Sequence, residues 1–177
     1  MNPPERPSTP RLNLPPAQFR VKLCDDGVWR IHDRLRRRFV ALTPEEWVRQ
    51  NFVDWLITAK GYPEHLMANE VALTFNDTRR RCDTVLFAPS ASAAPGSLCP
   101  LAVVEYKAPG IEITQRVFDQ IARYNMVMGA PLLIVSNGMR HFCCLTCQEH
   151  SGQGSGESRT YTFLRDIPDY QHISSLR

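Results

Sequence analysis

The chain has 177 residues and a formal net charge of +3, with 43% hydrophobic and 22% charged residues. This composition is typical of one soluble globular domain and excludes a disordered chain. The longest apolar runs, such as PLLIV at 131–135, are too short to span a bilayer. The N-terminal stretch has no apolar run that could serve as a signal peptide, so we expect a cytoplasmic location.

The first segment, residues 1–17, is rich in proline and lacks periodicity, which predicts a flexible Pro-rich tail. Residues 18–177 are expected to form a single domain. Alternating apolar residues on both sides of Asp26-Gly27 predict a β-hairpin.

Capping residues and the spacing of apolar residues predict two helices. Thr43 is a good N-cap, Pro44 suits the first helical position, and Glu46 completes a capping box. An apolar stripe at helical spacing continues from there until Gly61-Tyr62-Pro63. The second helix is predicted from about Thr114 to Met128.

The remaining segments read as strands. Two strands are expected around Asn76-Asp77, and a third covers the LAVVEYKAP stretch. LLIV at 132–135 is typical of a buried central strand, and HFCCLTC with TYTFL predicts a final strand pair. The order of elements predicts an α/β fold, with a mixed central sheet flanked by helices.

The most informative residues lie in that third strand. Side chains alternate along a strand, so Glu105 and Lys107 share one face. Asp83 lies near the start of the preceding strand and is expected to stand across from Glu105. Two neighbouring carboxylates repel each other unless a cation lies between them, and oxygen ligands favour Mg²⁺ or Mn²⁺. Lys107 is then placed to stabilise the charge on a phosphate.

This D…ExK pattern resembles the signature of the PD-(D/E)XK nuclease superfamily. The ordered blocks LTPEEWVRQ, RRRCDTVLF, VVEYKAP, FDQIARYN and LIVSNG also resemble the N-terminal nuclease-like domain of type I restriction enzyme R subunits, over about residues 28–145. The resemblance implies a restriction-endonuclease-like fold and a metal-dependent endonuclease acting on DNA. It implies metal ligation by Asp83 and Glu105, a catalytic role for Lys107, and a QxxxY element at Gln120 and Tyr124.

The resemblance also implies that the first helix supplies an acid to the metal site. Glu45 and Glu46 are the two candidates. Glu45 is expected to face the sheet, which favours it as the third metal ligand, whereas Glu46 suits the capping box. Glu70 is a weaker candidate for an extra ligand.

Two arginine clusters are expected to hold the DNA backbone without reading its sequence, and they comprise Arg36, Arg37 and Arg38 together with Arg79, Arg80 and Arg81. A solvated charged surface is the simpler interpretation of such runs. The Cys144-x-x-Cys147 pair suggests zinc, although buried thiols explain these residues better than a four-ligand site.

The sequence therefore predicts a Mg²⁺- or Mn²⁺-dependent deoxyribonuclease related to restriction or repair. Its partners are expected to be DNA and either a second copy or a restriction-modification complex, with no membrane. No G-x-x-x-x-G-K-[ST] phosphate loop is present in the 177 residues, so the chain is not expected to translocate DNA alone. The alternative is a catalytically inactive module that keeps the nuclease fold for nucleic-acid binding or assembly.

Overall fold

The computed structural model describes residues 4–75, 78–90, 94, 96–149 and 158–174. In chain order its elements are β1 (Val21–Leu23), β2 (Trp29–Asp33), β3 (Arg38–Ala41), α1 (Pro44–Thr58), the short 3₁₀ helix η1 (Glu64–Leu66), β4 (Met67–Phe75), β5 (Thr78–Pro89), β6 (Leu98–Tyr106), α2 (Gln115–Met128), β7 (Leu132–Ser136), β8 (His141–Glu149), β9 (Ser158–Leu164) and α3 (Tyr170–Ser174).

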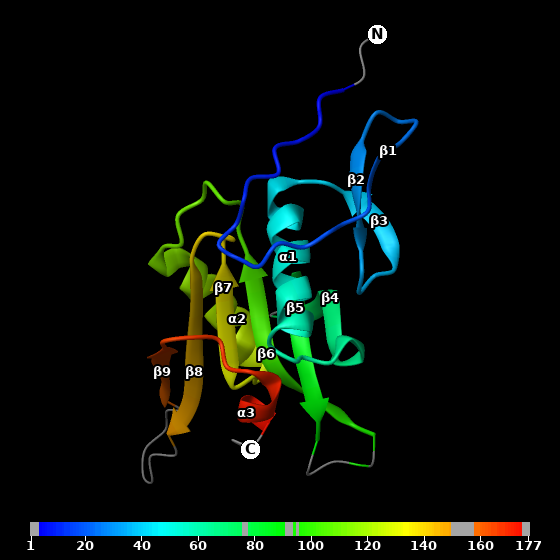
Figure 1. The fold of residues 1–177 in the computed structure, drawn as a ribbon. Coiled ribbons are helices and arrows are strands. Elements are labelled where there is room, and N and C mark those ends of the chain that lie inside the picture. Colours follow the sequence, from blue (N-terminus) through cyan, green and yellow to red (C-terminus); the bar gives the residue numbers. More distant parts are fainter. Residues whose placement is uncertain (1–3, 76–77, 91–93, 95, 150–157, 175–177) are drawn as a thin grey trace.

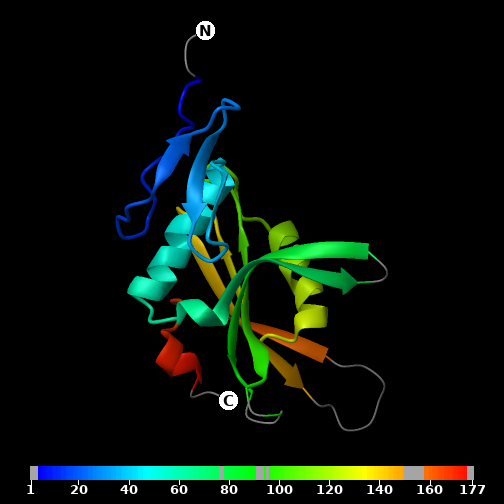
Figure 2. The same ribbon diagram turned by 90° about the vertical axis from the view of Figure 1, so that its right-hand side faces the viewer.

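The larger sheet has the strand order β4-β5-β6-β7-β8-β9. The β6–β7 pair is parallel and the other neighbouring pairs are antiparallel, so the sheet is mixed. Helix α2 connects the two parallel strands, as a parallel crossover requires. Helix α1 lies on one face of this sheet and α2 on the other (Figures 1 and 2). The predicted α/β fold, a mixed sheet flanked by helices, is confirmed.

The smaller sheet consists of β1, β2 and β3 in that order. The predicted hairpin at Asp26-Gly27 is present, and Gly27 supplies the left-handed backbone of the turn with a φ of 74°. Strand β3 was not predicted, because it is only four residues long and begins at the end of a run of arginines. The turn before it also takes Arg37 through a positive φ of 51°.

Helix α1 begins as predicted. The Thr43 side-chain oxygen accepts a hydrogen bond from the backbone N–H of Glu46 at 3.0 Å. Only this half of the capping box forms, because the Glu46 carboxylate accepts hydrogen bonds from Arg36, Arg49 and Gln50. Helix α2 has Thr114 at its N-cap without a side-chain capping bond, and Gly129 ends the helix with a φ of 63°.

Two apolar clusters form the core, one on each face of the large sheet. Val104 and Tyr106 of β6 pack with Phe52 of α1, while Val103 packs with Val117 and Ile121 of α2. Strands β6 and β7 are buried on both faces, which explains their nearly continuous apolar sequences. By the same alternation, Glu105 lies on the Val103 side of β6, toward α2.

Residues 4–17, predicted as a flexible tail, form no helix or strand. Leu12 in this segment is nevertheless 8% exposed and belongs to the core cluster around α1. Nearby, the indole N–H of Trp47 donates to the carbonyl of Pro10, and the N–H of Asn13 donates to the carbonyl of Gly138. The predicted turn at Asn76-Asp77 lies outside the described residues. Among the described helices, none has the length and apolar character needed to cross a membrane.

The contrast between the two N-caps gives a direct test. Replacing Thr43 with Ala removes the acceptor for the Glu46 N–H, so we expect a loss of about 1 kcal/mol in the free energy of unfolding. Urea denaturation measures the loss. Thr114→Ala is the matched control and is expected to cost less than half as much, since its hydroxyl caps no N–H. Equal losses in the two variants would show that the capping bond is not the cause.

Candidate functional site

Glu105 occupies the penultimate position of β6, a strand that is paired on both sides, and its exposed fraction is only 4%. Lys107 follows the end of the strand, and its ammonium Nζ lies 2.7 Å from Oε1 of Glu105. The backbone N–H of Lys107 donates to the carbonyl of Ser136 in β7, which fixes the chain at this point. Glu105 and Lys107, which side-chain alternation predicts on one face of the strand, therefore form an ion pair.

Asp83 lies on the neighbouring strand β5. Thr84 is paired with Val104, and the next position along brings Asp83 opposite Glu105. The Oδ2 atom of Asp83 accepts a hydrogen bond of 2.8 Å from the backbone N–H of Tyr106. The structure thus brings together the two carboxylates that the sequence analysis expected to be neighbours.

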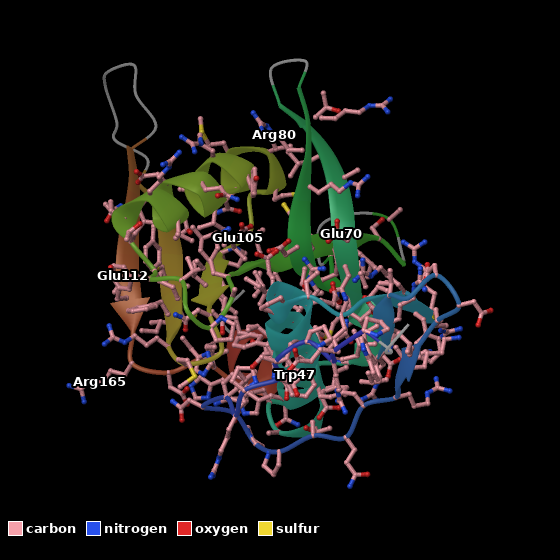
Figure 3. All side chains as sticks on the ribbon, turned by 90° about the horizontal axis from the view of Figure 1, so that it is seen from above. Trp47, Glu70, Arg80, Glu105, Glu112 and Arg165 are labelled. Carbon is pink, nitrogen blue, oxygen red and sulfur yellow. The ribbon has the colours of Figure 1, made fainter. Side chains whose placement is uncertain are left out.

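Glu70 extends this pair into a row of three acids across three adjacent strands. The pairs Asn69–Thr84 and Val71–Cys82 leave Glu70 opposite Asp83. Glu70 has a φ of 57°, a left-handed conformation that costs roughly 1 kcal/mol or more in a residue with a side chain. Figure 3 shows Glu70 and Glu105 on opposite sides of the end of α1. The left-handed backbone of Glu70 therefore places strain within this row of acids.

Arg49 of helix α1 is the residue that the sequence analysis missed. The residue is 4% exposed, and its guanidinium lies 2.7 Å from Glu46, 2.9 Å from Glu70 and 2.8 Å from Asp83. Its Nε atom has no hydrogen-bond partner among the described residues. A sequence signal existed, because Arg49 lies four residues after Glu45 and three before Phe52, on the side of the helix expected to face the sheet.

The same ionic network continues into the smaller sheet through Arg36. Its guanidinium contacts Asp33 and lies 2.8 Å from Oε1 of Glu46. The Arg36 side chain is therefore engaged internally, which does not suit the phosphate contact expected from the sequence. Arg37 and Arg38 are exposed.

Glu45 and Glu46 take different surroundings. Burial raises the pKa of Glu45, and the nearby carboxylate of Asp83 raises it further, while Lys107 lowers it. Glu45 is thus within electrostatic reach of the Asp83 and Lys107 side chains. Glu46 instead accepts hydrogen bonds within the arginine network.

The electrostatics of the central pair follow from burial and proximity. Burial raises the pKa of Glu105 to about 7, Asp83 contributes in the same direction, and Lys107 opposes the shift. Burial also raises the pKa of Asp83, although Arg49 beside it acts against this. Despite its own burial, Lys107 has a raised pKa because Glu105 stabilises the ammonium. The acids repel each other and are held together by two cationic side chains.

Helix α2 contributes to the site from the face of the sheet opposite to α1. Gln120 donates from Nε2 to Oε1 of Glu105 at 2.6 Å and to the hydroxyl of Tyr124 at 3.2 Å. The two residues are four apart and so lie on one side of the helix. Gln120 therefore contacts the acid of the ExK stretch directly, and Tyr124 contacts Gln120.

The second arginine cluster is exposed on β5. Arg81 lies 3.5 Å from Glu70, with 72% of its side chain exposed. Arg80 lines an open cavity beside the site, together with residues of α2.

No three His, Cys, Asp or Glu side chains in the described part of the chain are grouped to hold a metal ion together. Cys143 and Cys144 are buried and have pKa values raised to about 12 and about 11 by burial, as expected of inert core thiols. The side chain of Cys147 lies outside the described residues.

Comparison with known protein families identifies the family of this chain. Residues 44–168 match the family model described as "Type I restriction enzyme R protein N terminus (HSDR_N)". The match covers well over half of the 177 residues, so the chain belongs to this family. The matched region contains the acids, Lys107 and the Gln120–Tyr124 pair, whereas Arg36–Arg38 precede it. Searches of the curated proteins and of the solved structures found no significant match.

The buried position of Arg49 makes a strong prediction for stability. Arg49→Met keeps much of the side-chain length but leaves three carboxylates without their shared cation, and we expect a loss of about 3–5 kcal/mol in the free energy of unfolding at pH 7. Arg34→Met is the matched control, because Arg34 pairs with Asp54 and Glu64 while its side chain is 43% exposed. Its expected loss is about 1 kcal/mol or less. Denaturant titrations that gave equal losses would contradict the role assigned to Arg49.

The raised pKa of Glu105 predicts a pH dependence of stability. Its pKa of about 7 in the folded chain exceeds its usual value of 4.5, so the native state binds more protons between these values. The stabilising contribution is fully present below 4.5 and is lost as the pH rises through about 7. We expect Glu105→Gln to remove a fall on the order of 2 kcal/mol between pH 5 and pH 8. Unfolding free energies across this range measure it, and exposed Glu112→Gln should keep the wild-type profile.

Proposed function

We propose that the protein is a divalent-metal-dependent endonuclease of the PD-(D/E)XK superfamily that hydrolyses DNA phosphodiester bonds in restriction or repair. The observation that carries the proposal is the convergence of Asp83, Glu105 and Lys107 at one end of the sheet, with Lys107 2.7 Å from Glu105. The family of type I restriction enzyme R protein N termini supports a restriction-related role. We further propose that the protein works in the cytoplasm, with a second copy or within a restriction-modification complex.

The chemistry of the donors fits Mg²⁺ or Mn²⁺. Asp83 and Glu105 offer neighbouring carboxylate oxygens. Burial raises the pKa of both, and Asp83 raises the pKa of Glu105 further, which is the electrostatic condition that a cation relieves. Mg²⁺ is commonly held by one or two carboxylates, with waters and substrate phosphate completing the shell. Oε2 of Glu105 accepts no hydrogen bond from any described residue, which leaves it available. Glu45, whose pKa the Asp83 carboxylate raises, is the third acid that we assign to the metal. The three described side chains are not grouped around one point, so this assignment requires Glu45 to move toward the other two when the ion binds.

The side chains have separate roles in hydrolysis. A divalent ion held by Asp83, Glu105 and Glu45 would polarise the scissile phosphate and make a water molecule more acidic. The oxygen of the attacking water forms a bond to phosphorus as the bond to the leaving sugar oxygen breaks. The attacking water gives a proton to solvent, and the leaving oxygen takes one from solvent to become a hydroxyl. Lys107 is an ammonium group near neutral pH because its pKa is raised, so it orients the water and stabilises negative charge instead of accepting a proton.

Gln120 and Tyr124 act as positioning residues. The amide of Gln120 holds Oε1 of Glu105, and the hydroxyl of Tyr124 holds the amide. This fixes the direction of the second oxygen of Glu105. Exposed arginines contact the DNA backbone, and we assign this role to Arg37, Arg38, Arg79, Arg80 and Arg81.

A second candidate function is a catalytically inactive module for nucleic-acid binding or assembly. One observation favours it: both carboxylate oxygens of Asp83 are occupied by protein donors, Arg49 and the backbone N–H of Tyr106. In an active enzyme a metal ion has to bind Asp83 beside these donors, through a remaining lone pair, whereas in an inactive module the donors alone satisfy the carboxylate.

Plasmid cleavage with added Mg²⁺ or Mn²⁺ separates the two functions. We expect cleavage that EDTA abolishes and that falls by about 100-fold or more in Asp83→Ala and Lys107→Ala, because each removes a group acting on the reacting phosphate. Lys22→Ala is the matched control, since Lys22 is an exposed lysine on β1. Cleavage that survives both site variants would reject the nuclease proposal, and DNA binding by the wild type without cleavage would favour the module.

A further inference from the structure

The open cavity beside the site has a volume of about 510 Å³. Strand β5 contributes Arg80 to its lining, and helix α2 contributes Arg116, Gln120, Arg123 and Tyr124. Figure 3 shows Arg80 close to α2, on the side of the helix that faces the β4–β5 pair. Two of the three arginines were not singled out by the sequence analysis, because each stands alone in the helix.

The periodicity of α2 explains how the lining forms. Arg116, Gln120 and Arg123 are separated by four and three residues, so they project from one side of the helix. Val117 and Ile121 lie on the buried side and pack against the sheet. The apolar contacts that fix the helix therefore also fix the direction in which its arginines point.

Among the residues that the structure describes, no acid neutralises the charges in the cavity. Arg80, Arg116 and Arg123 are exposed, and none of them makes an ion pair with a residue that the structure describes. Arg36 and Arg49, in contrast, are enclosed by carboxylates. Guanidinium groups gathered without acids favour an anion among them, and their planar donors match phosphate oxygens.

The cavity is continuous with the candidate site through Gln120. This residue lines the cavity, and its Nε2 also donates to Glu105 at 2.6 Å. One nucleic-acid strand can therefore place one phosphate among the arginines and a neighbouring phosphate near Glu105 and Lys107. The volume falls within the range of pockets that bind small molecules, about 300–1,000 Å³, which suits part of one strand rather than a duplex.

We propose that this cavity binds internal phosphates of a single nucleic-acid strand, next to the phosphodiester placed over Glu105 and Lys107. The inference rests on the proposed function and assigns Arg80, Arg116 and Arg123 as the backbone contacts that lead the strand into the site. Because only the phosphates are held, binding is expected to depend on salt and to be indifferent to base sequence.

The test measures binding in EDTA, so that it does not depend on catalysis. The probe is a single-stranded oligonucleotide with fluorescein at its 3′ end and a 5′ hydroxyl. Fluorescence anisotropy measures its dissociation constant at several salt concentrations. The double variant Arg116→Gln/Arg123→Gln is expected to raise the dissociation constant on the order of 10-fold and to reduce the salt slope by about 1.4, which corresponds to two lost contacts on a single strand.

Arg165→Gln is the matched control, because Arg165 is exposed and lies away from Arg80 and Glu105 in Figure 3. It should keep the wild-type dissociation constant and slope. Unchanged thermal midpoints confirm that the variants are folded, as expected for exposed positions. The same oligonucleotide with a 5′ phosphate should bind equally well, since the proposal concerns internal phosphates.

Three results would overturn the proposal: a double variant that binds like the wild type, an equal loss in Arg165→Gln, or a 5′ phosphate that strengthens binding as much as the arginines do. The last would make the cavity a pocket for strand ends. None of these depends on cleavage, so a chain that binds through the arginines but never cuts DNA would refute the nuclease proposal alone.

Discussion

The buried guanidinium of Arg49 joins helix α1 to the strand that carries Asp83, and through Glu46 it also connects to Arg36 and Asp33 in the smaller sheet. Alternating charges thus form a continuous chain between the two sheets. A buried ion pair gives little net stability relative to apolar packing, but it is specific, because any displacement leaves a charge unpaired. The position of the smaller sheet and the position of Asp83 therefore depend on the same arginine.

The row of acids next to Arg49, in contrast, brings like charges together. Glu70, Asp83 and Glu105 face one another across three strands, and burial with mutual repulsion raises the pKa of both Asp83 and Glu105. Glu70 adds a left-handed backbone to this unfavourable group. Strain and like charges of this kind persist where the surrounding structure over-determines them, and they concentrate at functional sites. Arg49 and Lys107 supply the compensating charge.

The arginines divide into two populations that the sequence does not distinguish. Arg36 stands in a run of arginines that reads as a nucleic-acid contact, yet it is enclosed by Asp33 and Glu46. Arg116 and Arg123 are isolated in the sequence but meet Arg80 in one cavity. Clustering along the chain is therefore a poor guide to clustering in space, since a helix and a strand bring together residues that are dozens of positions apart.

Local patterns were sufficient for the α/β class, for the N-cap at Thr43 and for the shared face of Glu105 and Lys107, because capping and side-chain alternation depend on neighbours within a few residues. The pairing of β5 with β6 was also accessible, since the two strands follow each other in the chain. The spacing also placed Arg49 on the side of α1 that faces the sheet, but strand β3 and the carboxylates that enclose Arg49 were not accessible. These depend on which carboxylates the folded elements bring within reach, and a buried charge is placed by its partners across the whole fold rather than by the residues beside it in sequence.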